Sequence, residues 1–331
     1  MPNAYVTGTG FYVPPRIVTN NALSKYMNTT DEWIRERTGI QTRHFVEKGV
    51  GPSDLAIPAA EQALKAAELS VEDIDFMIFA TSTPDYYIPG SGCLLQEKMG
   101  FNEIGALDIR VQCSGFVYGI SIAEQYIKTG AFNNILLVGA EVQSTAMDLS
   151  DEGRDTAIIF GDGAGAVIIQ ATEENKGILS THMHTEGKYL KELWVEAPAS
   201  RAGHPRILPK HLTQGKQYLQ MNGKEVFRHA VKRFEEVIHE ALTANNLQVD
   251  DIDMLIPHQA NLRITKLHQK KLGLGDSQIY SNIHKYGNTT AASIPIALAE
   301  AINERKISKG DLVVFASFGS GFTWASAVMK W

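Results

Sequence analysis

The same pattern of hydrophobic and polar positions occurs twice along this chain. Val71–Ile78 (VEDIDFMI) and Val249–Ile256 (VDDIDMLI) match almost residue for residue. In both copies, apolar residues at helical spacing precede a short polar turn and an apolar strand. A second strand, Asn134–Val138 (NILLV), is repeated as Asp311–Phe315 (DLVVF). The pattern predicts an α/β protein of two pseudo-twofold-related halves, with mixed, largely parallel sheets sandwiching buried helices.

The repeat also places three reactive side chains at equivalent ends of the predicted sheets. We divide the chain into residues 1–172, which carry Cys113, and residues 173–331, which carry His258 and Asn288. His258 directly follows the second-copy strand, and Asn288 stands just before the helix that corresponds to the one Cys113 begins. Functional residues of α/β sheets gather at the carboxyl ends of strands. We therefore expect the three side chains to meet near the pseudo-axis.

Cys113 lies between a predicted strand, Ala106–Val111, and a predicted helix, Phe116–Lys128. Unpaired N–H groups in the first turn of a helix carry partial positive charge, which favours a thiolate over a thiol. This environment suits a nucleophile. The alternative is a small apolar residue packed under the sheet, because free cysteine is among the most buried residue types.

Composition limits the classes of protein to consider. The chain has 331 residues, 44% of them hydrophobic and 21% charged, which is typical of a soluble globular protein. Two cysteines do not make a disulfide framework, and a nucleophilic thiol must stay reduced, so we expect a cytoplasmic location. The first residues lack the features of a signal peptide, and no apolar run reaches the roughly 20 residues that span a bilayer. A net charge of −6 argues against nucleic acid as a partner.

A Cys/His/Asn set is compatible with more than one chemistry. Taken singly, His258 is more often a structural histidine, and Asn288 more often a turn or helix-cap residue. In a papain-like hydrolase, the imidazole deprotonates the thiol and the amide orients the imidazole. The sequence around Cys113 lacks the CG[SA]C[WY] signature of that class, and a twofold α/β repeat is the wrong scaffold.

Six motifs occur in the order seen in β-ketoacyl-acyl carrier protein synthase III, a family with the thiolase fold, and this resemblance covers essentially the whole chain. The motifs are Asp31–Ile40 (DEWIRERTGI), Cys113–Phe116 (CSGF), Phe160–Ala166 (FGDGAGA), Pro257–Asn261 (PHQAN), Gly287–Thr289 (GNT) and Gly321–Trp324 (GFTW). The glycine-rich stretch lacks the Lys-Ser/Thr of a phosphate loop, so we interpret it as a tight turn between strands Ala157–Phe160 and Ala166–Ile169.

The resemblance implies a two-stage acyl transfer without a metal or redox cofactor. Cys113 would take the acyl group from a short acyl-CoA, while the backbone N–H groups of Cys113 and Ser320 hold the oxyanion. Malonyl-acyl carrier protein would then lose CO₂. Hydrogen bonds from His258 and Asn288 would stabilise the resulting enolate, which attacks the acyl-enzyme and releases a 3-ketoacyl product.

The resemblance also assigns residues that bind the two substrates. The CoA nucleotide is expected against Trp33, Arg37 and Arg154. Docking of the acidic acyl carrier protein is expected at Arg228, Arg263, Lys270 and Lys271. Ile88 matches a position associated with primer length that is often Phe, so the smaller side chain suggests a roomier acyl pocket that admits branched primers.

The resemblance also implies binding partners, and it leaves alternative functions open. We expect acyl-CoA and malonyl-acyl carrier protein as substrates and a homodimer by family analogy. The segment His184–Met221 is longer than in the shorter family members and is expected to run over the surface. A synthase III-like acyltransferase or ketosynthase of specialised metabolism stays open as an alternative. So does a catalytically inactive binding partner of an acyl carrier, although Cys113, His258 and Asn288 are all present.

Overall fold

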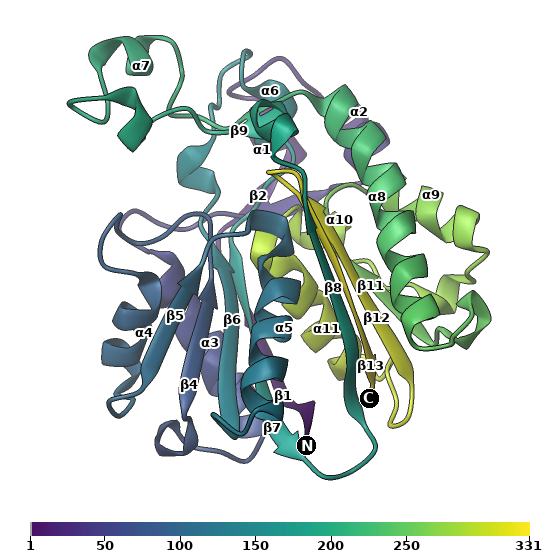
Figure 1. Ribbon diagram of the computed structural model, residues 1–331. Coiled ribbons are helices and arrows are strands. Elements are labelled where there is room, and N and C mark those ends of the chain that lie inside the picture. The colour runs from purple at the N-terminus through teal and green to yellow at the C-terminus, as the bar shows by residue number, and fades with distance from the viewer. Residues whose placement is uncertain (1) are drawn as a thin grey trace.

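Two mixed β-sheets with helices between and outside them form the framework of the protein in this computed structural model, which describes residues 2–331 (Figure 1). The first sheet has the order β1-β7-β6-β4-β5 and the second the order β8-β13-β12-β11. The strands of the first are β1 (Asn3–Tyr12), β4 (Phe76–Ala80), β5 (Gly105–Ile109), β6 (Asn134–Glu141) and β7 (Gly163–Thr172). Those of the second are β8 (Gly177–Thr185), β11 (Met254–Pro257), β12 (Leu312–Gly319) and β13 (Thr323–Lys330).

The central layer consists of α5 (Gly115–Lys128) and α11 (Ser293–Asn303), which lie between the two sheets in Figure 1. Phe116 and Ile120 of α5 share one buried cluster with Leu298 of α11, and strand residues such as Ile78 and Phe315 complete it from both sheets. Because most of α5 is buried, it is apolar around most of its circumference. The predicted helix after Cys113 is confirmed.

The outer faces of the two sheets are covered by helices of the two halves. On the first sheet these are α3 (Pro52–Ala66) and α4 (Ser91–Met99), and on the second they are α8 (Gly223–Ala244) and α9 (Leu262–Leu272). Their apolar stripes form separate clusters with the strands beneath. The layers therefore alternate as helix, sheet, helix, sheet, helix, which confirms two related α/β halves. The boundary after residue 172 falls between β7 and β8 and stays a prediction.

Backbone conformations follow the internal repeat closely. Glu68 and Asn246, at equivalent places after α3 and α8, both have φ of +55°. Gln112 and Thr290, before α5 and α11, have φ of +45° and +53°. Left-handed conformations are uncommon for residues other than glycine, so their occurrence in matched pairs reflects a shared local geometry. Cys113 therefore occupies the place that Ala291 occupies in the second half.

Two predictions about the strands were wrong. Parallel pairing is limited to β5-β4-β6 in the first sheet and β11-β12 in the second, and all other pairs are antiparallel. The sheets are mixed but not largely parallel, because the chain returns from β6 to β7 without a crossover helix of the kind that parallel pairing needs. Ala157–Phe160 is not a strand either. Ala157 ends the short helix α6 (Arg154–Ala157), whereas Ala166–Ile169 does lie in β7.

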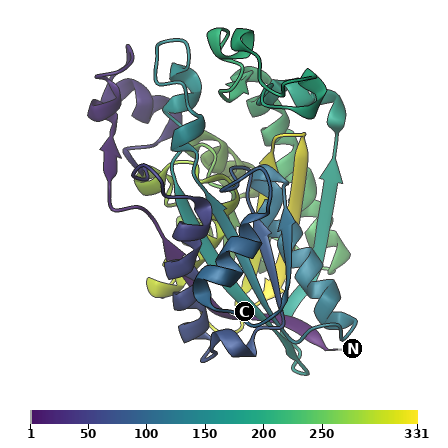
Figure 2. The same cartoon turned by 90° about the vertical axis from the view of Figure 1, so that its left-hand side faces the viewer.

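The remaining elements surround the end of the molecule opposite the two termini (Figures 1 and 2). They are β2 (Ile17–Thr19), α1 (Asn20–Leu23), α2 (Asp31–Thr38), β3 (Thr42–His44), β9 (Leu193–Trp194), α7 (Pro209–Thr213), β10 (Gln220–Met221) and α10 (Ile283–Tyr286). The surface excursion predicted for 184–221 begins only after β8, and its α7 part forms the green lobe at the top of Figure 1. Among residues 2–331, no helix has the length and apolar character needed to cross a membrane.

Candidate active site

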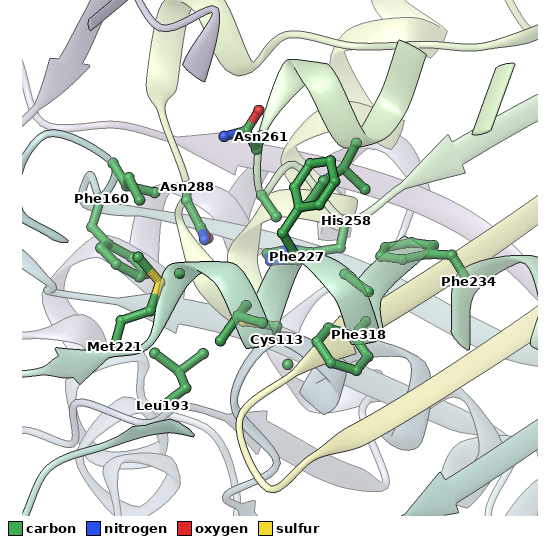
Figure 3. A pocket seen from close by; sticks show the side chains of 17 residues that line it. Cys113, Phe160, Leu193, Met221, Phe227, Phe234, His258, Asn261, Asn288 and Phe318 are labelled. Carbon is green, nitrogen blue, oxygen red and sulfur yellow. The ribbon is translucent and has the colours of Figure 1, made fainter. Parts of the chain in front are cut away.

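A cavity of about 150 Å³ brings Cys113, His258 and Asn288 together, as Figure 3 shows. Cys113 comes from the turn before α5, His258 from the end of β11, and Asn288 from the loop before α11. Apolar side chains form much of the remaining wall, among them Phe160 and Phe318. The sequence-based expectation that these three side chains converge is met by the geometry. Their catalytic roles remain predictions.

Cys113 lies in a tight turn that requires glycine on the facing strand. It is the middle residue of a 3₁₀ turn, Gln112–Ser114, and only 6% of its surface is exposed. A Cβ atom on Gly319 would lie 2.6 Å from the Cβ and 3.0 Å from the sulfur of Cys113. Glycine at this position therefore lets the end of β12 approach the nucleophile. The backbone N–H groups of Cys113 and Ser320 lie close enough to the sulfur to lower the pKa of the thiol, and their role as oxyanion donors stays a prediction.

The thiol of Cys113 is not ionised at rest, which differs from the expectation of a stabilised thiolate. Burial raises its pKa to about 12, and the negative charge of Glu141 acts in the same direction. The two N–H groups lower this pKa, but by less than burial raises it. Desolvation outweighs the helix terminus here because Cys113 is buried, with only a small part of its surface reaching solvent. Burial therefore favours the neutral thiol over the thiolate at this position.

His258 is a buried, neutral imidazole with one nitrogen turned toward the cavity. Its backbone N–H donates to Ala316 O over 2.8 Å, which fixes the residue at the end of β11. Nδ1 lies 2.6 Å from Ser293 Oγ, whereas Nε2 has no hydrogen-bond partner within the described chain. Burial lowers the pKa of His258 to about 3. At neutral pH the ring is therefore uncharged and can offer one N–H to a ligand.

Asn288 is held by the glycine-rich segment of the other half. Its N–H donates to Ile159 O over 2.9 Å, and its carbonyl accepts from Gly161 N over 3.0 Å. A Cβ on Gly161 would lie 2.3 Å from Tyr286 O, so glycine is needed for this approach. The Thr290 N–H donates to Oδ1 of Asn288 over 2.8 Å. That bond leaves the Nδ2 amide group free to donate into the cavity, where Figure 3 places it.

Glu141 is a buried carboxylate beside the nucleophile that the sequence analysis did not identify. It ends β6 and accepts hydrogen bonds from Ser82 N and Oγ, from Thr83 Oγ1 and from Gln143 Nε2. Burial raises its pKa to about 7, although these donors act in the opposite direction. Gln143 also donates to Thr290 Oγ1 over 2.9 Å, so Glu141 connects the wall of the first half to the loop that carries Asn288.

We expect Glu141→Gln to make Cys113 more reactive toward alkylation. The substitution removes a negative charge that disfavours the thiolate, so the pKa of Cys113 falls. Below that pKa the alkylation rate follows the thiolate fraction, and each unit of decrease raises the rate about tenfold at fixed pH. The measurement is iodoacetamide labelling of Cys113 at about pH 8 to 10, where Glu141 is ionised, in a Cys93→Ala background. Glu124→Gln, which neutralises a buried carboxylate of α5, is the matched control. Equal rates in both variants would contradict this interpretation.

A second and larger cavity, of about 730 Å³, also has Cys113 in its wall. One part of its wall is polar and includes Thr83, Gln112 and Gln143, and another part is apolar and includes Leu193 and Trp194 from the excursion after β8. Cys113 therefore lines both cavities.

Ile88 does not line either of these two cavities. Its side chain is 77% exposed in a loop before α4, next to the exposed Tyr86 and Tyr87. The neighbouring Tyr87, not Ile88, belongs to the wall of the larger cavity. The assignment of Ile88 to the acyl pocket therefore does not hold within one chain, because the loop turns this side chain outward.

The three residues expected to bind CoA form a stacked group outside the cavity. The guanidinium carbons of Arg37 and Arg154 lie 4.1 and 4.7 Å from the centre of the Trp33 ring. Such distances are typical of cation–π contacts. The group is tied to the cavity rim through Asn261, whose Nδ2 donates to Arg37 O over 2.9 Å and which itself lines the cavity.

The four residues expected to dock the carrier protein lie on α8 and α9, which pack together. Arg228 is paired with Glu225, and Lys271 with Glu235, so part of their charge is neutralised. Arg263 and Lys270 have no ion-pair partner among residues 2–331. Arg263 lies over Phe227, a residue of the cavity wall, with 5.8 Å between the guanidinium carbon and the ring centre. Arg263 therefore lies beside the wall of the cavity.

Sequence reasoning missed Ser293 and Glu141, together with the larger cavity. Serine at the start of a helix and glutamate at the end of a strand are common, and nothing in their local patterns distinguishes them. In the part of the chain that the structure describes, no three His, Cys, Asp or Glu side chains are grouped to hold a metal ion.

Comparison with known proteins finds similarity to the synthase III family along nearly the whole chain. Residues 107–187 match the family model described as 3-oxoacyl-[acyl-carrier-protein] synthase III, and residues 242–331 match the model of its C-terminal part. The chain is 45% identical to β-ketoacyl-[acyl-carrier-protein] synthase III of Clostridioides difficile over 99% of this chain and 98% of that protein.

Two solved structures show the same fold. The synthase III structure from Aquifex aeolicus is 39% identical, with a TM-score of 0.91 over 99% of this chain and 100% of that one. The priming β-ketosynthase of the R1128 polyketide biosynthetic pathway is 28% identical, with a TM-score of 0.92 over 99% of this chain and 96% of that one. The identity, the coverage and the shared fold show that this chain belongs to the β-ketoacyl-[acyl-carrier-protein] synthase III family of acyltransferases.

Proposed function

We propose that this protein starts fatty acid synthesis by condensing a short acyl-CoA primer with malonyl-acyl carrier protein. The observation that carries the proposal is the orientation of two donors beside the Cys113 thiol. His258 Nε2 has no partner in the described chain and Asn288 Nδ2 is left free by the Thr290 N–H. Two aimed, uncharged donors in a mostly apolar cavity are suited to stabilise an enolate oxygen as its charge develops.

In the first stage, the sulfur of Cys113 attacks the thioester carbonyl of acyl-CoA. The bond between that carbon and the CoA sulfur breaks, and the proton of Cys113 ends on the released CoA thiol. The N–H groups of Cys113 and Ser320 hold the oxyanion of the tetrahedral intermediate. Trp33, Arg37 and Arg154 hold the CoA nucleotide, and the acyl chain occupies the larger cavity beside Cys113.

In the second stage, the malonyl thioester enters the smaller cavity. Its carboxylate leaves as CO₂, and the electron pair of the broken C–C bond forms an enolate whose oxygen accepts hydrogen bonds from His258 and Asn288. The enolate carbon then attacks the acyl-enzyme carbonyl, the bond between that carbon and the sulfur breaks, and the departing Cys113 thiolate takes up one proton from solvent. The low pKa of His258 supports this scheme, because a neutral ring can donate one hydrogen bond without taking up a proton.

The test is a two-step assay on the purified chain. Incubation with a panel of acyl-CoA primers, followed by intact-mass measurement, is expected to give an acyl adduct on Cys113. Addition of malonyl-acyl carrier protein is then expected to release CO₂ and a 3-ketoacyl product. No adduct with any primer would refute the enzyme proposal. An adduct without condensation would favour a synthase III-like enzyme of specialised metabolism with another acceptor.

Charge reversal at Arg263 tests the docking surface. We expect Arg263→Glu to raise the apparent KM for malonyl-acyl carrier protein about tenfold, because it replaces an attractive charge at the cavity rim by a repulsive one. Acylation of Cys113 by acyl-CoA is expected to stay unchanged. Lys309→Glu, at an exposed site in the loop before β12, is the control. Equal losses in both stages would show that Arg263 does not act in docking.

The homodimer and the cytoplasmic location also belong to this proposal. Three consecutive exposed apolar side chains, Tyr86, Tyr87 and Ile88, support association with a second copy, since such groups on a surface commonly mark an interface. Light scattering of the purified protein measures this state directly. The need of Cys113 for a reducing compartment supports the location.

A further inference from the structure

One neighbour of His258 has no role in the scheme above. Ser293 is the first residue of α11 and is buried, with 2% of its surface exposed. Its Oγ lies 2.6 Å from Nδ1 of His258 and accepts a hydrogen bond from the Gln259 N–H over 3.3 Å. No other hydrogen bond of this hydroxyl is found among residues 2–331.

The hydrogens of the Ser293 hydroxyl and the His258 ring can be arranged in two ways. A serine hydroxyl donates one hydrogen and accepts up to two, and a neutral imidazole carries its single hydrogen on one nitrogen. If Nδ1 carried it, Ser293 Oγ would accept from both Nδ1 and Gln259 N, and its own hydrogen would be buried without an acceptor. If Nε2 carries it, the hydroxyl donates to Nδ1 and accepts from Gln259 N. In the second arrangement every hydrogen-bonding group of Ser293 has a partner, and the remaining donor, Nε2–H, faces the cavity, where a ligand can accept its hydrogen. The first arrangement instead leaves the hydrogen of Ser293 without an acceptor inside the protein, which is costly.

We propose that Ser293 is a positioning residue that holds His258 in the tautomer with hydrogen on Nε2, so that this nitrogen donates to the enolate oxygen of the malonyl substrate. The inference deepens the proposed function and rests on it. Ser293 also fixes the direction of the ring, because the short Oγ–Nδ1 contact and the backbone bond of His258 to Ala316 constrain it from two sides. Mutation of groups that orient metal-bound imidazoles typically changes affinity or activity about 10- to 100-fold, and we expect an effect of the same order here.

The internal repeat supports a specific role for the hydroxyl. Ser293 occupies the place in the second half that Gly115 occupies in the first, and Gly115 has no side chain to offer. A common structural requirement of the two helix starts is thus not the reason for a serine here. The hydroxyl is present only in the half that contributes His258.

The first experiment measures the tautomer in the unaltered protein. Long-range ¹H–¹⁵N spectra of the ¹⁵N-histidine-labelled chain distinguish the two neutral forms, and a His258→Gln sample identifies the resonance. We expect hydrogen on Nε2 between about pH 6 and 8, since the ring stays neutral there. Hydrogen on Nδ1 would overturn the proposal, whatever the activity of the protein.

The second experiment separates the two stages in Ser293 variants. In Ser293→Ala, we expect condensation with malonyl-acyl carrier protein to slow about 10- to 100-fold, with little change in its KM. Acylation of Cys113 is expected to stay within about twofold, because the oxyanion donors Cys113 N and Ser320 N are untouched. Ser293→Thr, which keeps the hydroxyl, should recover most of the loss.

Ser326→Ala removes another fully buried hydroxyl, which donates to Val237 O over 2.9 Å, and serves as the structural control. The proposal would be overturned if Ser326→Ala slowed condensation as much as Ser293→Ala does. It would also be overturned if Ser293→Ala slowed acylation and condensation equally. Either result would show that Ser293 has only a structural role. If the unaltered protein itself forms neither adduct nor product, the proposed function fails instead, and the tautomer measurement still decides the state of His258.

Discussion

Cys113→Ala is expected to abolish acylation and to reduce condensation on the order of 10⁴-fold or more, since no other nucleophile can form the acyl-enzyme. The same variant should still remove CO₂ from malonyl-acyl carrier protein. Decarboxylation needs only the donors on His258 and Asn288, and neither is altered. Intact mass after incubation with acyl-CoA and CO₂ release from the malonyl substrate measure the two steps separately.

Cys93→Ala provides the matched control for this variant. Cys93 is an exposed residue of α4, so its removal should change neither step. If the acyl adduct persisted in Cys113→Ala, or were lost in Cys93→Ala, the assignment of Cys113 as the nucleophile would be wrong. Loss of decarboxylation together with acylation, in a variant that remains folded, would show that the thiol itself takes part in enolate formation.

Asn288→Asp is expected to have the second largest effect. Aspartate retains the oxygen that accepts from the Thr290 N–H but replaces the Nδ2 donor with a second acceptor. Removal of one donor from an oxyanion site costs about 10²- to 10³-fold in rate, and a buried negative charge beside a developing enolate adds to this loss. Decarboxylation and condensation should both fall by at least this factor, as measured by CO₂ release and product formation.

Acylation of Cys113 should be much less affected by Asn288→Asp, because the oxyanion of that stage is held by backbone N–H groups. Asn303→Asp, at the exposed end of α11, makes the same chemical change away from the cavity and should behave like the unaltered protein. If Asn288→Asp slowed both stages equally while Asn303→Asp slowed neither, Asn288 would act on the whole cavity rather than on the enolate.

The agreement between sequence and structure is best where a local pattern has a single physical meaning. The matched segments 71–78 and 249–256 indicated two related halves, and apolar helical spacing after Cys113 predicted the helix α5, most of which is buried. The parallel character of the sheets was overestimated, because apolar strands look alike whether their neighbours run parallel or antiparallel. Similarly, 157–160 has the apolar residues of a strand but forms the end of α6 and a turn.

The sequence by itself determined the twofold architecture and the choice of Cys113, His258 and Asn288 as the predicted reacting side chains, because period and order are carried by the residues along the chain. Only the tertiary structure decided their state. Burial raises the pKa of Cys113 and lowers that of His258, and the contacts of Ser293 and Thr290 orient the two donors. It also turned Ile88 outward. Desolvation and hydrogen-bond direction depend on residues far apart in sequence, so they arise only when the two halves pack together.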